Sequence, residues 1–186
     1  GQEVCSGFVG VPSSINRTKN YIAKSLAPAA KCFHGQMLNL RVYNRPLSPE
    51  EINECMKVDG TPPPMNINSG LQLHLPLNEI VENAAKEKEV VDVSPAKLNG
   101  KVHGATIVAD SRFGNCINFD GVDDYIDLPK ETIPQTGEIT ISFWAYGGKS
   151  LPKNTVLISA YNKGNQPLLR VYLPWSDRRI ILDYGN

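Results

Sequence analysis

The strongest structural signal in this chain is residues 33–52, which read FHGQMLNLRVYNRPLSPEEI. Apolar residues alternate with Asn, Arg and Tyr over 38–43, a pattern typical of a strand with one buried face. The next residues predict a helix start, with Ser48 as the N-cap, Pro49 at the first helical position and Glu51 completing a capping box. This stretch therefore predicts a strand that runs into a capped helix turn, near the start of the chain.

The rest of the chain repeats the strand pattern many times. Apolar residues alternate with others over 71–77, where Pro76 predicts an edge strand because proline cannot donate to a ladder. Further short strands are predicted at 117–119, 126–128, 139–146, 156–161, 168–173 and 180–184, separated by turn signals such as Asp120-Gly121. Many short strands with almost no helix predict an all-β, antiparallel sandwich.

A proline-rich segment divides the chain. Residues 58–70 contain Gly60-Thr61-Pro62-Pro63-Pro64, a composition that favours an extended and semi-rigid linker. The predicted organisation is therefore a first part at 1–57, a linker at 58–70 and a second part at 71–186.

Several motifs resemble the laminin-G-like, concanavalin A-like jelly rolls, the superfamily that includes pentraxins and many surface lectins. Residues 71–77 (LQLHLPL), 91–94 (VDVS), 100–104 (GKVHG), 113–126 (FGNCINFDGVDDYI) and 139–144 (ITISFW) resemble the beginning of such a domain. Residues 20–25 (NYIAKS) and 33–52 resemble its end. The resemblance implies a jelly-roll β-sandwich that is tandem or split across the chain.

The order of these motifs is reversed relative to that family, and the middle of the family's domain is absent. Three arrangements are compatible with this order. The chain can be a window from a longer tandem array, with 1–57 ending one domain and 71–186 beginning the next. It can be a fragment completed by another chain. Alternatively, residues 1–57 can close the sandwich begun by 71–186, as a circular permutation or a swap between copies.

Composition excludes several classes of partner. The chain carries 19 acidic and 19 basic residues without a basic stripe, so nucleic acid is not an expected partner. No apolar run approaches the roughly 20 residues that cross a bilayer, so this segment is not expected to insert into a membrane.

Cysteines and a sequon favour an extracellular or cell-surface location. Cys5, Cys32, Cys55 and Cys116 lack Cys-x-x-Cys spacing and are disulfide candidates, although the sequence does not choose among their three pairings. Asn16-Arg17-Thr18 is a sequon for N-glycosylation at Asn16. Four reduced thiols and a chance sequon are the alternative.

Catalytic carboxylates are not expected. The glucanase members of the resembled superfamily carry Glu-x-Asp-x-x-Glu on one strand, and this chain has no such run, so we expect a non-enzymatic protein. Calcium is the one cofactor that the sequence suggests, because Asp120, Asp123 and Asp124 gather oxygen ligands in a short loop. The alternative is that these residues only form a turn.

Aromatic residues supply the candidate ligand site. Trp144 and Tyr146 should share the face of their strand opposite Ile141 and Phe143. We expect Arg170 and Tyr172 on a neighbouring strand of that face and Trp175 in the following loop; the five candidate residues are Trp144, Tyr146, Arg170, Tyr172 and Trp175. A sugar-binding face, a protein interface and burial of Trp144 in the core are all compatible with this pattern.

The expected function is therefore an extracellular, laminin-G-like module for adhesion, binding glycans or extracellular proteins within a larger multidomain protein. The alternative is a structural repeat of a filament, coat or cell- or cilium-surface assembly, in which copies of the chain bind one another.

Overall fold

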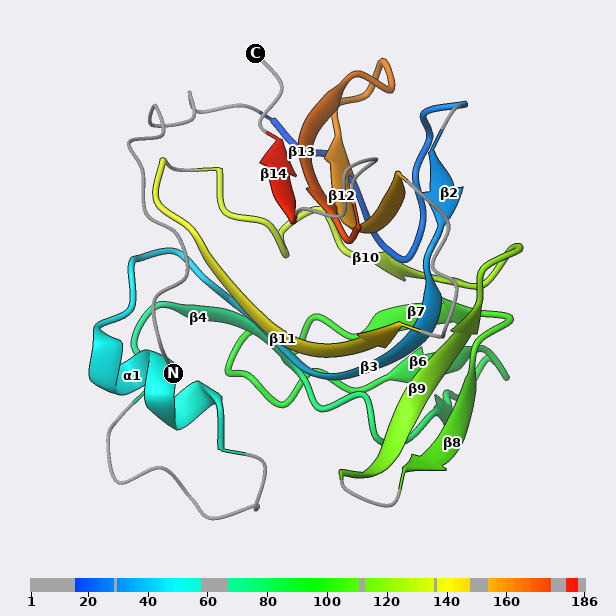
Figure 1. Ribbon diagram of the computed structural model, residues 1–186, viewed down its shortest axis with the longest axis horizontal. Helices are drawn as coiled ribbons and strands as arrows, with labels where there is room; N and C mark the ends of the chain where they lie inside the picture. Colours follow the sequence, from blue (N-terminus) through cyan, green and yellow to red (C-terminus); the bar gives the residue numbers. More distant parts are fainter. Residues whose placement is uncertain are drawn as a thin grey trace.

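The computed structural model describes residues 16–28, 30–57, 67–110, 113–135, 137–147, 154–174 and 180–183. These residues form two β-sheets and one short helix, which confirms the predicted all-β class (Figure 1). Apart from the short pair of β2 with β12, every strand pair among them is antiparallel.

The large sheet has nine strands. Its order is β14 (Ile181–Asp183), β13 (Pro167–Tyr172), β12 (Thr155–Tyr161), β1 (Lys19–Ile22), β10 (Tyr125–Leu128), β7 (Gly100–His103), β6 (Lys88–Val90) and β5 (Val81–Glu82), with β2 (Lys31–Cys32) beside β12. Residues 79–90 contain the β5–β6 hairpin.

The small sheet has five strands. Its order is β11 (Thr140–Gly147), β3 (His34–Tyr43), β9 (Gly114–Asp120) and β8 (Thr106–Asp110), with β4 (Leu71–Leu75) also beside β3. The ten residues of β3 pair with β9 through their first half and with β4 through their second half, while β11 runs along the opposite edge.

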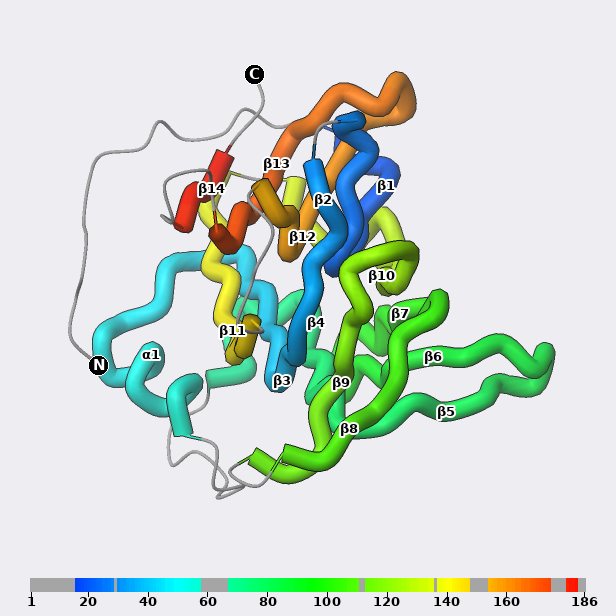
Figure 2. The backbone as a smooth tube through the Cα atoms, turned by 45° about the vertical axis from the view of Figure 1, so that its right-hand side comes forward, coloured from blue at the N-terminus to red at the C-terminus, as the bar shows by residue number. Residues whose placement is uncertain are grey.

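Strands from before the proline-rich segment occupy the middle of both sheets. β1 lies between β10 and β12 in the large sheet, and β3 lies between β11 and β9 in the small sheet (Figure 2). Of the three arrangements allowed by the sequence, the structure shows residues 16–57 closing the sandwich within the same chain. The assignment of 1–57 and 71–186 to successive domains of a longer protein stays a prediction.

One apolar core lies between the sheets. The alternating side chains of β3, β4 and β9 enter it from the small sheet, and those of β1, β10 and β12 enter it from the large sheet. Leu40, Leu73, Phe119 and Ile126 are all 0% exposed. Because the pleat sends every second side chain to the other side of a sheet, the remaining residues of these strands form two outer faces.

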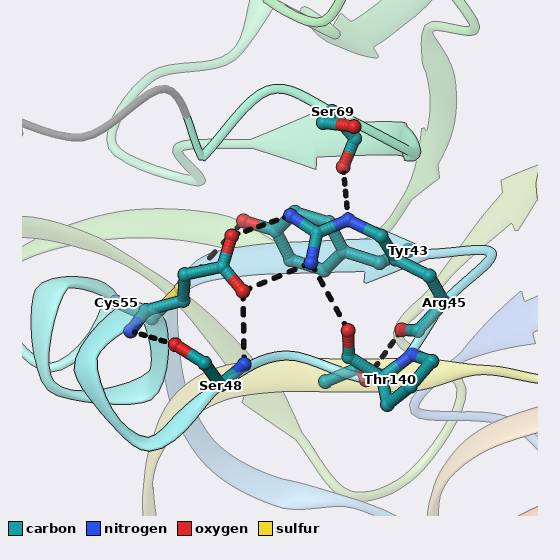
Figure 3. A network of polar contacts seen from close by, with 8 residues as sticks. Tyr43, Arg45, Ser48, Cys55, Ser69 and Thr140 are labelled. Atoms are coloured by element: carbon teal, nitrogen blue, oxygen red, sulfur yellow. Dashed lines mark hydrogen bonds and ion pairs between the residues drawn. The ribbon is translucent and has the colours of Figure 1, made fainter.

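Helix α1 (Pro49–Cys55) begins as the sequence predicts. The backbone amide of Glu51 donates to Ser48 Oγ, and the amide of Ser48 donates to Glu51 Oε2, which completes the predicted capping box. Glu51 also receives two hydrogen bonds from Arg45, at 2.6 and 2.9 Å. Arg45 Nε donates to the carbonyl of Ser69, and Thr140 Oγ1 donates to the carbonyl of Arg45 (Figure 3). The Arg45–Glu51 pair therefore ties the helix to the small sheet.

The predicted linker is described only in part. Residues 58–66 lie outside the described residues, whereas 67–70 form a turn. Ile67 is 5% exposed and packs with Tyr43, Cys55 and Leu71 in a second, smaller apolar cluster beneath α1.

β4 is an edge strand, as Pro76 predicts. Its only strand partner in the described part of the chain is β3. A loop protects its other edge: the amide of His74 donates to Asp92 Oδ1, and the amide of Val93 donates to the carbonyl of His74. In the described ranges, no helix has the length and apolar character needed to cross a membrane.

Candidate functional site

Trp144 and Tyr146 lie on the outer face of the small sheet. In the antiparallel register with β3 they stand opposite Leu38 and Gln36. Phe143 and its alternate neighbours pack against the core from the other face of β11. The predicted division of this strand into an aromatic outer face and an apolar inner face is confirmed.

A pocket of about 220 Å³ is formed on this outer face; we call it the Trp144 pocket. Phe113 stacks against Trp144, with ring centroids 5.8 Å apart and planes inclined by 29°. Tyr146 is 54% exposed, so it presents much of its side chain to solvent. The lining residues are Gln36, Met37, Leu38, Asp110, Phe113, Cys116, Trp144, Ala145 and Tyr146.

Cys116 lines the pocket, and its thiol is not a reactive nucleophile. Cys116 is 3% exposed, and its Sγ donates to Gln36 Oε1 at 3.5 Å. Burial raises the pKa of this thiol, and the negative charge of Asp110 raises it further. A thiol held protonated has little nucleophilic character, so this pocket can bind a ligand but offers no thiolate chemistry.

Sequence reasoning found two of the aromatic lining residues and missed the third. Phe113 lies in the turn between β8 and β9, and Gln36 and Leu38 belong to β3. Alternation over 38–43 predicts Leu38 on the buried face with Leu40, but the register shift between β3 and β11 beside Asn39 turns Leu38 to the outer face with Gln36. Their meeting with Trp144 depends on the β3–β11 pairing, which joins residues about a hundred positions apart and leaves no local signal.

Arg170 and Tyr172 do not share the face of Trp144, contrary to the prediction. They belong to β13, which lies in the large sheet, whereas β11 is an edge strand of the small sheet. Arg170 instead forms an ion pair with Asp183 of β14 and stands near the ring of Tyr172. Trp175 lies outside the described residues.

The three predicted calcium ligands do come together. Asp120, Asp123 and Asp124 each place a carboxylate oxygen within 4.8 Å of the others. Two of the carboxylates close the loop: Asp120 Oδ1 accepts from the amide of Val122 at 2.7 Å, and Asp124 Oδ2 accepts from the amide of Asp120 at 2.8 Å.

Asp124 is the buried member of this acidic loop, with 6% exposure. Burial raises the pKa of its carboxyl group, and the neighbouring charges of Asp120 and Asp123 raise it further. Gly104 packs against this carboxylate with φ of +75°, and a Cβ there would overlap Asp124 Oδ1. The local fold thus depends on Asp124 as a turn residue.

The acidic loop could supply part of a cation site. Calcium takes six to eight oxygen ligands, often including backbone carbonyls and waters. Three carboxylates are a partial set for such an ion, while their hydrogen bonds to backbone amides already explain why Asp120 and Asp124 occupy this loop. Calcium binding stays a prediction.

A second group of aromatic rings lies on the large sheet and contacts the ammonium group of Lys24. Lys24 Nζ lies 3.5 Å from the ring centroid of Tyr125 and 5.1 Å from that of Tyr21. His103 stacks on Tyr125 with centroids 4.2 Å apart. Because Lys24 already makes the cation–π contacts, this group is a stabilising contact between strands.

The described cysteines are free thiols. Cys32 lies on β2, Cys55 on α1 and Cys116 on β9, and none of the three is in a disulfide. Any complete pairing of four cysteines would join two of these three, so the predicted disulfide framework is wrong for this structure. Cys55 Sγ instead contacts the Tyr43 hydroxyl, and Cys116 Sγ contacts Gln36 Oε1. Cys5 lies outside the described residues.

Asn16 is exposed, as an acceptor of a glycan must be. The next residue, Arg17, is only 2% exposed and donates from Nη1 to the carbonyl of Pro134 at 2.6 Å. The sequon therefore joins an exposed residue to a buried arginine at the start of the described residues.

Comparisons with protein-family models, with curated proteins and with solved structures found no match. The resemblance to laminin-G-like domains accordingly rests on the sequence motifs quoted above.

Proposed function

We propose that this chain is a non-enzymatic, extracellular binding module of the laminin-G-like jelly-roll type, and that it holds one sugar ring of a glycan in the Trp144 pocket. The observation that carries the proposal is the convergence of Phe113, Trp144 and the exposed Tyr146 on one pocket of the small sheet.

The size and chemistry of the pocket favour a single ring. At about 220 Å³ it is smaller than the roughly 300–1,000 Å³ of pockets that take drug-sized ligands. Aromatic faces offer a flat apolar surface to the C–H face of a sugar. Gln36 and Asp110 add an amide and a carboxylate to the lining, and such groups can pair with ring hydroxyls.

A protein ligand that inserts one apolar side chain is the second candidate. The observation that favours it is the apolar remainder of the lining, which includes Met37, Leu38 and Ala145. Tyr and Trp are also enriched among the residues that dominate protein interfaces.

The extracellular part of the proposal rests on the exposed sequon residue Asn16. The free thiols of Cys32, Cys55 and Cys116 give it no support, because a disulfide framework would have been the stronger sign of an oxidising compartment.

A glycan array tests the proposal, with the folded protein applied in calcium and in chelator. The chain has two tryptophans, so a Trp175→Phe variant leaves Trp144 as the sole indole reporter. We expect a sugar found on the array to change Trp144 fluorescence with a saturable dependence on concentration.

Matched variants then locate the site. Tyr146→Ala should weaken binding at least tenfold, whereas Tyr125→Ala, which removes a tyrosine from the outer face of the other sheet, should leave the affinity unchanged. Binding of no sugar on the array under either condition, or equal losses in the two variants, would refute a glycan site in this pocket.

A further inference from the structure

The sandwich has two sheet edges on one side. Among the strands that the structure describes, β11 pairs only with β3 and β14 pairs only with β13. Figure 2 shows β11 and β14 on the same side of the molecule, so the edge of the small sheet and the edge of the large sheet border the same side of the core.

Core-facing side chains on this side are incompletely covered. Leu182 of β14 is paired with Val171, and so points to the core side of its sheet, but it is 44% exposed. Ile141 and Phe143 of β11 are only partly buried, whereas Leu40, on the adjacent β3, is 0% exposed. The apolar interior therefore reaches solvent along β11 in the part of the molecule that is described.

β11 also lacks the protection that edge strands usually carry. Natural edges are blocked by charges, proline or brevity, because a free edge pairs readily with another strand. Residues 139–147 read ITISFWAYG and contain neither a charged residue nor a proline. Of the other edge strands, β8, β14 and β5 each contain an acidic residue, namely Asp110, Asp183 and Glu82. The free edge of β4 is instead covered by the loop that contains Asp92 and Val93.

Only an extended strand can satisfy such an edge, since a row of backbone donors and acceptors is paired by another strand. The strand must be uncharged and apolar at alternate positions. β11 itself meets both conditions. We propose that two copies of this chain associate by antiparallel pairing of β11 with β11, across a two-fold axis at Phe143.

The two-fold axis fixes the register. Phe143 stands opposite Phe143 of the second copy, Ile141 stands opposite Ala145, and Ser142 stands opposite Trp144. The core-facing side chains of the two copies, such as Phe143, thus meet on one face of the joined sheet and extend the apolar core. The two Trp144 pockets open on the opposite face of that sheet. This association is independent of the sugar proposal, because it uses the edge and inner face of β11.

Sedimentation velocity over a wide range of protein concentration tests for the dimer. The expected result is a reversible monomer–dimer equilibrium. A single monomeric species at every concentration would overturn the proposal.

Cysteine cross-linking tests the register. Phe143→Cys places two thiols directly opposite each other, where paired Cα atoms are about 4.5–5.5 Å apart, within the range of a disulfide. In Ile141→Cys, on the same face of the same strand, the two thiols are separated by four residues, about 13 Å. We expect a covalent dimer at least tenfold faster from Phe143→Cys, with the native cysteines present in both variants. A dimer that cross-links equally in both variants uses another surface and refutes the pairing.

Hydrogen exchange of the unmodified protein covers the case in which Phe143→Cys fails to fold. The amides of 141–145 should become more protected as the protein is concentrated. Protection that persists at high dilution would mean that the same chain covers the edge. Absence of protection at every concentration would mean that the edge stays free for a strand of another protein. Either result overturns the proposal.

Discussion

Gly104 and Gly114 form a natural pair of probes at the scale of single residues. Their φ angles are +75° and +74°, so an alanine at either site enters the left-handed region. At Gly114 nothing lies within 4 Å of the position that a Cβ would take, whereas at Gly104 the Cβ would overlap the carboxylate of Asp124.

We predict that Gly114→Ala lowers the free energy of unfolding by about 1–2 kcal/mol, the usual cost of this backbone region. Gly104→Ala should cost more than this, because it must also displace a buried, hydrogen-bonded carboxylate. Chemical denaturation of both variants measures the difference. Equal losses would show that the packing of Gly104 on Asp124 contributes nothing to stability.

Asp124 allows the turn role and the cation role of the acidic loop to be separated. Its pKa is raised in the folded state, so the folded protein binds this proton more tightly than the unfolded chain does. The free energy of unfolding therefore falls as the pH rises above the ordinary carboxyl pKa of 3.8 towards the raised pKa of the folded state. Near pH 7, the ionised Asp124 destabilises the fold.

Asp124→Asn keeps an oxygen acceptor and removes the charge, so in chelator we predict a melting temperature no lower than that of the wild type. Calorimetry in chelator and in calcium makes the measurement. A lower melting temperature of the variant in chelator would contradict the prediction. A calcium-induced rise that only the wild type shows would assign a cation to the loop.

At the scale of elements, the contact between α1 and the small sheet depends on one ion pair. The hydrogen bonds from Arg45 lower the pKa of Glu51 from 4.5 to about 2, with the amide of Ser48 contributing in the same direction. A carboxyl group whose pKa is depressed on folding stabilises the protein above its unfolded pKa, and that contribution is lost as the pH falls towards the folded value.

We predict that Glu51→Gln lowers the melting temperature at pH 7, and that the difference from the wild type shrinks between pH 4.5 and about 2. Gln can still complete the capping box, so the substitution isolates the charge. Glu50→Gln, in the same helical turn but outside the Arg45–Glu51 ion pair, is the control. A difference that does not depend on pH would assign the loss to packing instead.

Local patterns predicted the elements well and their arrangement poorly. The strand over 38–43, the capping box after Ser48 and the two faces of β11 were readable, because period-2 burial and helix caps are encoded within a few residues. The face of Leu38 was predicted wrongly, because the register shift between β3 and β11 beside Asn39 places Leu38 on the outer face while Leu40 and Val42 face the core. The placement of Arg170 beside Trp144 was wrong, because alternation says which face a residue takes but not which sheet its strand joins. The disulfide framework failed for the same reason, since no local pattern reports the distance between Cys32, Cys55 and Cys116.

At the scale of the whole molecule, the arrangement rests on two strands that come before the proline-rich segment. β1 joins β10 to β12, and β3 joins β11 to β9 and β4. Removing these strands would divide the large sheet and leave the small sheet without its central strand. Completion of both sheets within one chain is therefore the claim on which the site and the dimer edge depend.

Disulfide trapping at low protein concentration tests this claim. Tyr21 of β1 stands opposite Asp127 of β10, and Asp127 stands opposite Lys101 of β7. In the double variant Tyr21→Cys/Asp127→Cys we predict a rapid disulfide within the monomer, detected by mass spectrometry under non-reducing conditions. The control Tyr21→Cys/Lys101→Cys should form it far more slowly, because a strand lies between the two positions. A Tyr21→Cys/Asp127→Cys protein that forms only covalent dimers would show that β1 is exchanged between copies, and one that forms no disulfide would show that β1 and β10 are not neighbours.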